Sequence, residues 1–350
     1  MTQTIKVGIV GYGYATATFH APLISSVPGL ELLAIASSDA GKVYAAWPRL
    51  AVCETAQALF AREDIDLVII PTPNDTHYAL TAQALAAGKH VVVDKPFTLN
   101  TADALDLIEQ AEKAQRVLAV FHNRRWDADF MTVQTLLASG ELGRVTHFES
   151  HFDRFRPEVR QRWREGRGPG SGLWYDLGPH LLDQALCLFG MPQAISLDLA
   201  SQRNGAQTDD WFHAILRYAE SRVILHASAL VAHQGPRFVI HGTKGSYTKY
   251  GLDVQEDALK SGACPMDENW GADAQAGRLD LIRGTWVQQS SVPNQRGDYL
   301  QFYSGMRDAI LHGGANPVPA TEALQVMRLI ELGILSAVDG RLVQIANHHC

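Results

Sequence analysis

Three ionisable side chains in two short motifs have types and a spacing that suit chemistry. Lys95 stands in VVVDKPFTL (91–99), where an acid, a base and a proline follow three valines with the pattern of a buried strand. Asp176 and His180 stand four residues apart in GSGLWYDLGPHLLDQALCLFG (170–190), and so share one face if that segment is helical. An ammonium stabilises developing negative charge, and an imidazole accepts a proton near neutral pH. The same Asp and His spacing also occurs in ordinary polar pairs and in metal sites, but no third ligand follows at an informative spacing, so no metal is expected.

The first 122 residues alternate short apolar runs with segments of helical pattern. The runs are IKVGIVG (5–11), LELLAIAS (30–37), LVII (67–70), HVVVD (90–94) and VLAVF (117–121); the helical segments include 77–88, ended by Gly88, and 102–114, capped by Asn100 or Thr101. Near-continuous apolar strands that alternate with helices are typical of a parallel sheet covered on both faces. The pattern predicts an α/β fold that begins with a five-stranded, doubly wound, Rossmann-type domain at 1–122.

Residues 123–350 have a different pattern. Several segments alternate apolar and polar residues as in a half-exposed antiparallel sheet, namely 145–152, 194–201, 212–218, 222–231 and 237–242. Helical patterns interrupt them at 127–139, 174–189, 299–312 and 320–337. The sequence therefore predicts a second, α+β domain with a large, mostly antiparallel open sheet and helices on one face.

A glycine turn follows the first strand. Gly11, Tyr12, Gly13 and Tyr14 lie between that strand and a predicted helix, which is the context of a dinucleotide-binding turn. Thr16 replaces the third glycine of G-x-G-x-x-G, and taken alone the motif is as common in a structural turn as in a cofactor site. The α/β pattern that follows favours the cofactor.

The end of the second strand bears on the choice of cofactor. An acid at this place holds the ribose 2′-hydroxyl of NAD, but here Ser37 and Ser38 occupy it and Lys42 follows one turn later. Hydroxyls and an ammonium suit a 2′-phosphate, so NADP is favoured and NAD stays possible, with Asp39 as a displaced acid in the latter case.

Composition narrows the class of protein. A net charge of −7 over 350 residues argues against nucleic acid as a partner, although 151–168 holds six arginines that suit a partly ion-paired loop. Four dispersed cysteines and the lack of an apolar run near 20 residues predict a cytoplasmic protein with no membrane segment. The ending His348-His349-Cys350 suits a frayed terminus better than a metal site.

The motifs together resemble a known family. PTPNDTH (71–77), DKPF (94–97), FHNRRWD (121–127), the DxxxH segment and NPVPATEALQVMRLIE (316–331) occur in the order found in the family of glucose–fructose oxidoreductase, inositol dehydrogenase and the rhizopine-catabolism dehydrogenase. Within it the chain is most similar to NADP-dependent scyllo-inositol dehydrogenases. Asp94 replaces the glutamate of the family's E-K-P motif, and Ser171 the first glycine of its G-G-x-x-x-D-x-x-x-H motif.

The resemblance implies a nicotinamide-dependent dehydrogenase acting on a polyol or sugar. His180 would accept the hydroxyl proton, Asp176 would orient its ring or bind a hydroxyl, and Lys95 would stabilise the alkoxide, with imidazole and ammonium converging on one carbon. It also implies a cis Lys95–Pro96 bond, with Asp94 holding the loop or the lysine. Further contacts implied on the cofactor side are Thr72, Pro73, Asn74, His77, Asp94, Lys95, His122, Asn123, Trp163 and Arg164.

Other functions stay open at this point. A relative of this type can be a glycosidase that uses bound NAD for transient oxidation, or a dinucleotide sensor without catalysis, although the sensor would be expected to lack Lys95 or His180. Apolar residues on the outer face of the second sheet, as in RVILHASALV (222–231), predict a homodimer or homotetramer packed sheet to sheet.

Overall fold

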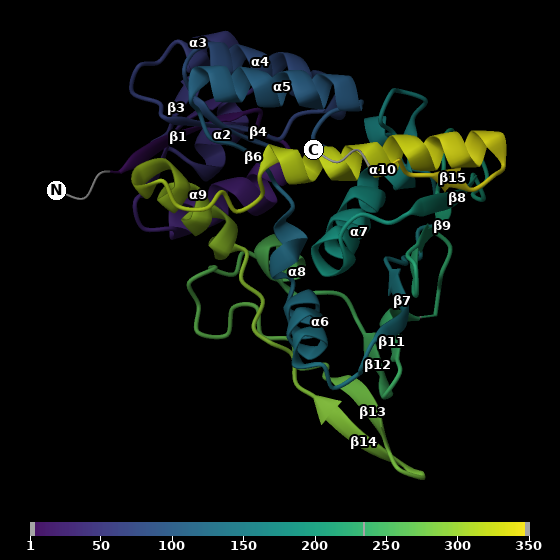
Figure 1. Cartoon of the computed structure of the whole chain (residues 1–350). Coiled ribbons are helices and arrows are strands. Elements are labelled where there is room, and N and C mark those ends of the chain that lie inside the picture. Colours follow the sequence, from purple (N-terminus) through teal and green to yellow (C-terminus); the bar gives the residue numbers. More distant parts are fainter. Residues whose placement is uncertain (1–3, 234, 347–350) are drawn as a thin grey trace. The chain divides into compact units, whose positions relative to one another are not determined.

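The computed structural model describes residues 4–233 and 235–346, which form two compact units (Figure 1). The first unit holds the chain up to Trp126, Gln255–Trp270 and Asp298–Met327, and the second holds Asp127–Val254, Gly271–Gly297 and the chain from Arg328. The opening segment of the first unit ends close to the predicted boundary, but two later segments return to that unit. The proposed ending motif 348–350 lies outside the described residues.

A parallel sheet is the centre of the first unit. Its described strands run in the order β3 (Ala51–Cys53), β2 (Leu30–Ala36), β1 (Ile5–Val10), β4 (Leu67–Ile70), β5 (His90–Val93) and β6 (Leu118–Val120). This is the doubly wound order whose carboxyl edge binds ligands next to β1. The prediction of five strands is wrong. The sheet has a sixth, the half-buried edge strand β3, which pairs only with β2 and which the sequence analysis missed although 50–53 is a short apolar run.

Helices cover this sheet on both sides. Figure 1 shows α3 (Ala56–Phe60), α4 (His77–Ala86) and α5 (Thr101–Ala114) on one side and α9 (Leu300–His312) on the other. The glycine turn leads into a π-helical stretch, η1 (Thr16–His20), and then α1 (Ala21–Ser26), which packs against α9. The unit also contains α2 (Ala40–Ala46), the short 3-10 turns η2 (Asn74–Thr76) and η3 (Asn123–Trp126), and α8 (Gln255–Lys260).

The second unit is built on a nine-stranded sheet in its described residues. The order is β14 (Trp286–Val292), β13 (Gly277–Arg283), β12 (Gly245–Tyr250), β11 (Pro236–Gly242), β7 (Val145–His151), β10 (Arg222–Ser228), β9 (Trp211–Arg217), β8 (Ala194–Ala200) and β15 (Val343–Gln344). Only β7 and β10 pair in parallel among these strands, so the predicted mostly antiparallel sheet is confirmed. The sequence analysis did not predict β12 to β15, although β12 and β13 alternate between buried and more exposed residues.

Helix α7 (Leu173–Phe189) packs on β9 and β10, and α6 (Ala128–Ser139) and the 3-10 turn η4 (Trp163–Glu165) complete the described helices that lie wholly in this unit. Helix α10 (Ala320–Asp339) begins in residues of the first unit and ends in residues of the second. Among the described helices, none is long and apolar enough to cross a membrane.

The N-terminus of α5 is fixed by the cap that the sequence suggested. Asn100 has an extended backbone, its Oδ1 accepts a hydrogen bond from the Asp103 backbone N–H at 2.8 Å, and its amide donates to the Asp103 carboxylate. Asn100 rather than Thr101 is therefore the capping residue, and it holds the chain that leaves the DKPF loop.

Replacing this cap tests the local account. Asn100→Ala is expected to lower the free energy of unfolding by about 1 kcal/mol, because it leaves an N–H at the helix start without its acceptor. Equilibrium urea unfolding measures the change, with Thr101→Ala as the matched control. A larger loss in the control than in Asn100→Ala would contradict the assignment.

Candidate active site

The glycine turn is shaped by its backbone. Gly11 has φ +87°, and its N–H donates to the Ala36 carbonyl at 2.7 Å, which joins the ends of β1 and β2. The Thr16 hydroxyl donates to the Gly11 carbonyl at 2.8 Å. Thr16 thus stabilises the turn through a side-chain hydrogen bond that a glycine at this position could not make. A Cβ at Gly13 would meet no atom within 4 Å, so the backbone there is open to a ligand.

One cavity gathers most of the predicted nucleotide contacts. Its lining includes Gly11, Tyr12, Gly13, Ser37, Ser38, Asp39 and Lys42, together with Glu54 and Thr55. The Lys42 ammonium lies 5.9 Å from the centre of the Tyr12 ring. The Asp39 carboxylate accepts the Lys42 backbone N–H at 2.9 Å and so caps α2. The open glycine backbone fits the phosphates of a dinucleotide, and Lys42 supplies one cation to a lining that also holds two acids.

Tyr14 is not in the lining of that cavity. Its hydroxyl donates to Glu256 Oε1 at 2.9 Å, and the second carboxylate oxygen accepts from the Arg124 guanidinium at 2.8 Å. Burial, followed by the Glu256 charge, raises the pKa of Tyr14, so the phenol keeps its proton. Glu256 therefore ties the glycine turn to the residues that follow β6. The sequence analysis missed it because α8 is a short helix far along the chain.

The loops after β4 and β5 are joined by one buried imidazole. His77 Nδ1 lies 2.8 Å from the Pro96 carbonyl oxygen, and Nε2 lies 3.0 Å from the Thr72 carbonyl oxygen. Burial lowers the pKa of His77, while the Asp94 charge and the two carbonyls oppose that shift. His77 was predicted to contact the cofactor, but in the structure its ring holds PTPN and DKPF together. The neighbouring Asn74 is buried at the start of η2.

The Asp94 carboxylate is the centre of the DKPF loop. Its Oδ1 accepts the Lys95 backbone N–H at 2.8 Å, its Oδ2 lies 3.9 Å from His20 Nε2, and the Lys95–Pro96 bond is cis as the resemblance implied. Burial raises the pKa of the Asp94 carboxyl, but His20, Lys95 and His77 outweigh burial and hold that pKa at about 2. The carboxylate is therefore charged at neutral pH and fixes the backbone of the loop that carries Lys95.

A second layer supports that carboxylate. His20 Nδ1 is hydrogen-bonded to the Tyr303 hydroxyl of α9, and burial raises the pKa of Tyr303 well above its usual value. The phenol thus keeps its proton, and the other ring nitrogen of His20, Nε2, lies 3.9 Å from the Asp94 carboxylate. The sequence analysis missed both His20 and Tyr303, because they are 283 residues apart and belong to no common motif.

The residues that follow β6, two of which were predicted to contact the cofactor, are buried. His122, Asn123 and Arg124 all have less than a tenth of their surface exposed. Arg124 holds Glu256, as described above, and Arg125 pairs with Glu322 at 2.7 Å. Contacts of His122 and Asn123 with a nicotinamide stay predictions.

Helix α7 presents the Asp and His pair of the second unit. The segment is helical through both residues, so their spacing of four places them on one face, and His180 is buried with 6% of its surface exposed. The Asp209 carboxylate caps the helix by accepting the Trp174 backbone N–H at 2.7 Å, and burial raises the pKa of Asp209. Gly172 has φ +97°, and a Cβ there would come within 2.0 Å of Asp209 Oδ1. This contact explains why the motif keeps its second glycine while Ser171 replaces the first.

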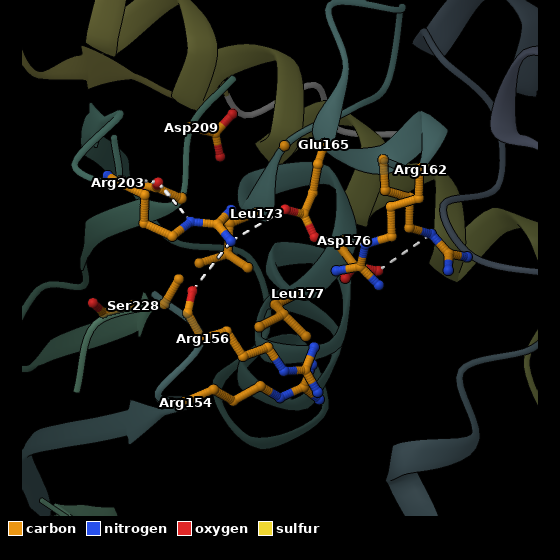
Figure 2. A pocket seen from close by; sticks show the side chains of 14 residues that line it. Arg154, Arg156, Arg162, Glu165, Leu173, Asp176, Leu177, Arg203, Asp209 and Ser228 are labelled. Carbon is orange, nitrogen blue, oxygen red and sulfur yellow. Dashed lines mark hydrogen bonds and ion pairs between the residues drawn. The ribbon is translucent and has the colours of Figure 1, made fainter. Parts of the chain in front are cut away.

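Arginines and acids line a cavity in front of α7. Figure 2 shows Leu177 of the helix next to Arg154 and Arg156, and Asp176 on the side of Arg162. The charged lining also includes Arg164, Glu165, Arg203, Asp209 and Asp210. Five arginines thus meet four acids. Arg203 pairs with Glu165 at 3.1 Å and with Asp210 at 2.9 Å, and Arg164 Nε lies 3.6 Å from Asp176 Oδ1. The expectation that loop 151–168 is partly ion-paired is confirmed.

Trp163 and Arg164 form a pair within η4. The Arg164 guanidinium lies 4.8 Å from the centre of the Trp163 ring, and Trp163 is 39% exposed. The stacking and the Asp176 ion pair together set the direction of Arg164. Their predicted contact with a cofactor stays a prediction, as do the joint roles of Lys95, Asp176 and His180.

Comparison with known proteins agrees with this architecture. Residues 5–122 match the model of an oxidoreductase family described as an NAD-binding Rossmann fold, and residues 134–345 match the model of that family's C-terminal alpha/beta domain. The chain is 55% identical to the uncharacterized oxidoreductase YdgJ of Escherichia coli over 96% of this chain and 97% of that one. It is 39% identical to the scyllo-inositol 2-dehydrogenase (NADP+) IolW of Bacillus subtilis over 98% of this chain and 96% of that one.

Solved structures give the same result. The YPO2259 putative oxidoreductase of Yersinia pestis superposes with a TM-score of 0.96 at 53% identity, covering 100% of this chain and 99% of that chain. The chain is therefore an oxidoreductase of the Gfo/Idh/MocA family, with an NAD(P)-binding Rossmann domain at its N-terminal end.

Proposed function

We propose that the chain is an NADP(H)-dependent dehydrogenase that interconverts a secondary hydroxyl and a ketone on an inositol-like polyol. The observation that carries the proposal is the cavity at the glycine turn, where Ser38 and Lys42 are in the lining and one oxygen of Asp39, also in the lining, accepts the Lys42 N–H as a helix cap. The similarity to an NADP-dependent scyllo-inositol dehydrogenase over nearly the whole chain supports it.

The cofactor would lie along the carboxyl edge of the parallel sheet. Gly11 and Gly13 would approach the pyrophosphate, and Ser37, Ser38 and Lys42 would meet the 2′-phosphate. Thr72, Pro73 and Asn74 would line the nicotinamide side, with His77 as their support. Bound there, NADP+ would accept the hydride that leaves the carbinol carbon.

The protein would manage the proton and the charge. His180 would take the hydroxyl proton as the hydride leaves, and Asp176, paired with Arg164, would hold a neighbouring hydroxyl or orient the ring. Lys95 would stabilise the negative charge that develops on the oxygen. Because the arginines of the cavity are largely matched by carboxylates, they suit the many hydroxyls of a neutral polyol better than a phosphorylated substrate.

We also propose that the protein forms a homo-oligomer and is located in the cytoplasm. The second sheet exposes Ile282, Trp286 and Val287 on its outer strands, each with more than half of its surface accessible, which supports a homo-oligomer that covers apolar surface. The described Cys53, Cys187 and Cys264 form no disulfide, which agrees with a reducing cytoplasm.

A panel of inositols and aldoses with NADP+ and NAD+, followed by the absorbance of the reduced nicotinamide, tests the function. We expect NADP-dependent oxidation of an inositol that Lys95→Met lowers by about 100-fold or more in kcat, since a charge at the developing oxyanion is lost. Lys113→Met, which removes an exposed lysine of α5, is the control. Full activity in Lys95→Met would refute the role of Lys95. Glycoside cleavage by a purified chain that retains nucleotide would instead favour the transient-oxidation glycosidase.

The preference for NADP rests on a separate pair of residues. Lys42→Ala is expected to weaken NADPH binding about tenfold with little effect on NADH, because only the former carries the 2′-phosphate. Ser38→Asp should shift the preference toward NADH by placing a carboxylate against that phosphate. Nicotinamide fluorescence titrations with both cofactors measure the ratio, with Lys113→Ala as control. An unchanged ratio in both variants would contradict the placement of the 2′-phosphate.

A further inference from the structure

Two neighbouring strands of the second unit bring two histidines and an aspartate onto one face of the sheet. Side chains alternate along β7, so Glu149, His151 and the following Asp153 point to the same side. The parallel ladder pairs His226 of β10 directly with His151. Beyond the end of the strand the pairing continues, because the Phe152 N–H donates to the His226 carbonyl at 2.9 Å. Backbone pairing therefore fixes the spacing of the three side chains.

Their potential ligand atoms converge. His151 Nδ1 lies 3.7 Å from Asp153 Oδ2, His226 Nε2 lies 3.5 Å from Asp153 Oδ1, and one ligand atom from each residue lies within 4.8 Å of the other two. Ligands at the usual bond lengths of about 2.1 Å in a tetrahedral zinc site are separated by about 3.4 Å. The cluster thus needs only small side-chain movements to surround an ion.

A carboxylate outside the cluster orients one of the histidines. Glu149 Oε2 lies 2.8 Å from His151 Nε2, so this nitrogen carries the proton and Nδ1 presents its lone pair toward Asp153. Histidines that bind metals are usually held in this way, with the second ring nitrogen donating to a carboxylate. The side chains of His151, Asp153 and His226 are 19%, 15% and 15% exposed in the single chain, so all three are partly buried.

We propose that His151, Asp153 and His226 bind a first-row divalent cation, with Zn²⁺ as the best match, through two imidazoles, one carboxylate and a water. The imidazoles exclude Mg²⁺ and Ca²⁺, which prefer oxygen ligands only. This inference is independent of the proposed function.

The position of the cluster indicates what a bound ion would do. Asp153 immediately precedes Arg154 and Arg156, which line the arginine cavity, and the Arg154 N–H donates to the Ser228 carbonyl at 2.9 Å. An ion shared by Asp153 and His226 would cross-link this segment to β10. The cation would therefore stabilise the wall of the cavity without touching it.

Protons compete with the ion at this cluster. Burial lowers the pKa of His151, but Asp153 and Glu149 outweigh burial and raise it. Burial lowers the pKa of His226, with Asp153 opposing and with His151 and His213 adding to the decrease. Metal binding requires unprotonated ring nitrogens, so protons and the ion compete for the same atoms.

Calorimetric titration of EDTA-treated protein with Zn²⁺ tests the proposal. The protein should carry His348→Asn, His349→Asn and Cys350→Ser, so that the terminal residues do not chelate the ion. We expect one saturable equivalent per chain and a rise in the thermal midpoint. Glu149→Gln should weaken binding by about 10- to 100-fold, and Asp153→Asn and His226→Asn by at least as much. His241→Asn, on the neighbouring strand β11, is the matched control and should bind as the parent does.

The contrary result is equally clear. Binding in Asp153→Asn and His226→Asn that equals the parent, or the absence of a saturable equivalent, would overturn the site. If either variant fails to fold, anomalous scattering at the zinc edge from crystals of the parent protein decides the matter. A peak between His151 and His226 supports the site, and zinc bound only elsewhere refutes it.

Discussion

The buried carboxylate of Asp94 is the interaction on which the arrangement of the first unit depends. A charge at the end of an apolar strand is costly unless it is compensated, and here the Lys95 N–H and the His20 ring compensate it. The resulting pKa of about 2 lies below the ordinary value of 3.8. Its contribution to stability is thus complete above pH 3.8 and is lost as the pH falls toward 2. The valines position the strand end, and the carboxylate fixes the lysine backbone there.

In the second unit, charged side chains of low exposure are compensated by ion pairs. Helix α7 begins at a glycine that fits against Asp209, and the charges in front of it neutralise one another through Arg203, Glu165 and Asp210. Asp176 takes part through Arg164. An arrangement of this kind holds many polar atoms at fixed positions without a large net charge, which suits recognition of a ring with several hydroxyls.

Local patterns sufficed for much of this architecture and failed where contacts are long-range. The apolar runs predicted five of the six parallel strands, and the helical pattern at 174–189 predicted the helix that Asp176 and His180 share. The sequence analysis also missed strands that do carry a pattern, since β12 and β13 alternate in burial along their length, whereas β14 is largely polar and β15 has only two residues. His20, Tyr303 and Glu256 were missed because their partners lie up to 283 residues away, a separation that no window of sequence reveals.

A double-mutant cycle on kcat/KM between Asp94 and Lys95 tests the central claim most directly, because it asks whether the carboxylate acts through the lysine. The account predicts that Asp94→Asn lowers kcat/KM in the parent protein but costs little further in the Lys95→Met background. Equal losses in both backgrounds would show that Asp94 acts independently of Lys95 and would contradict the account.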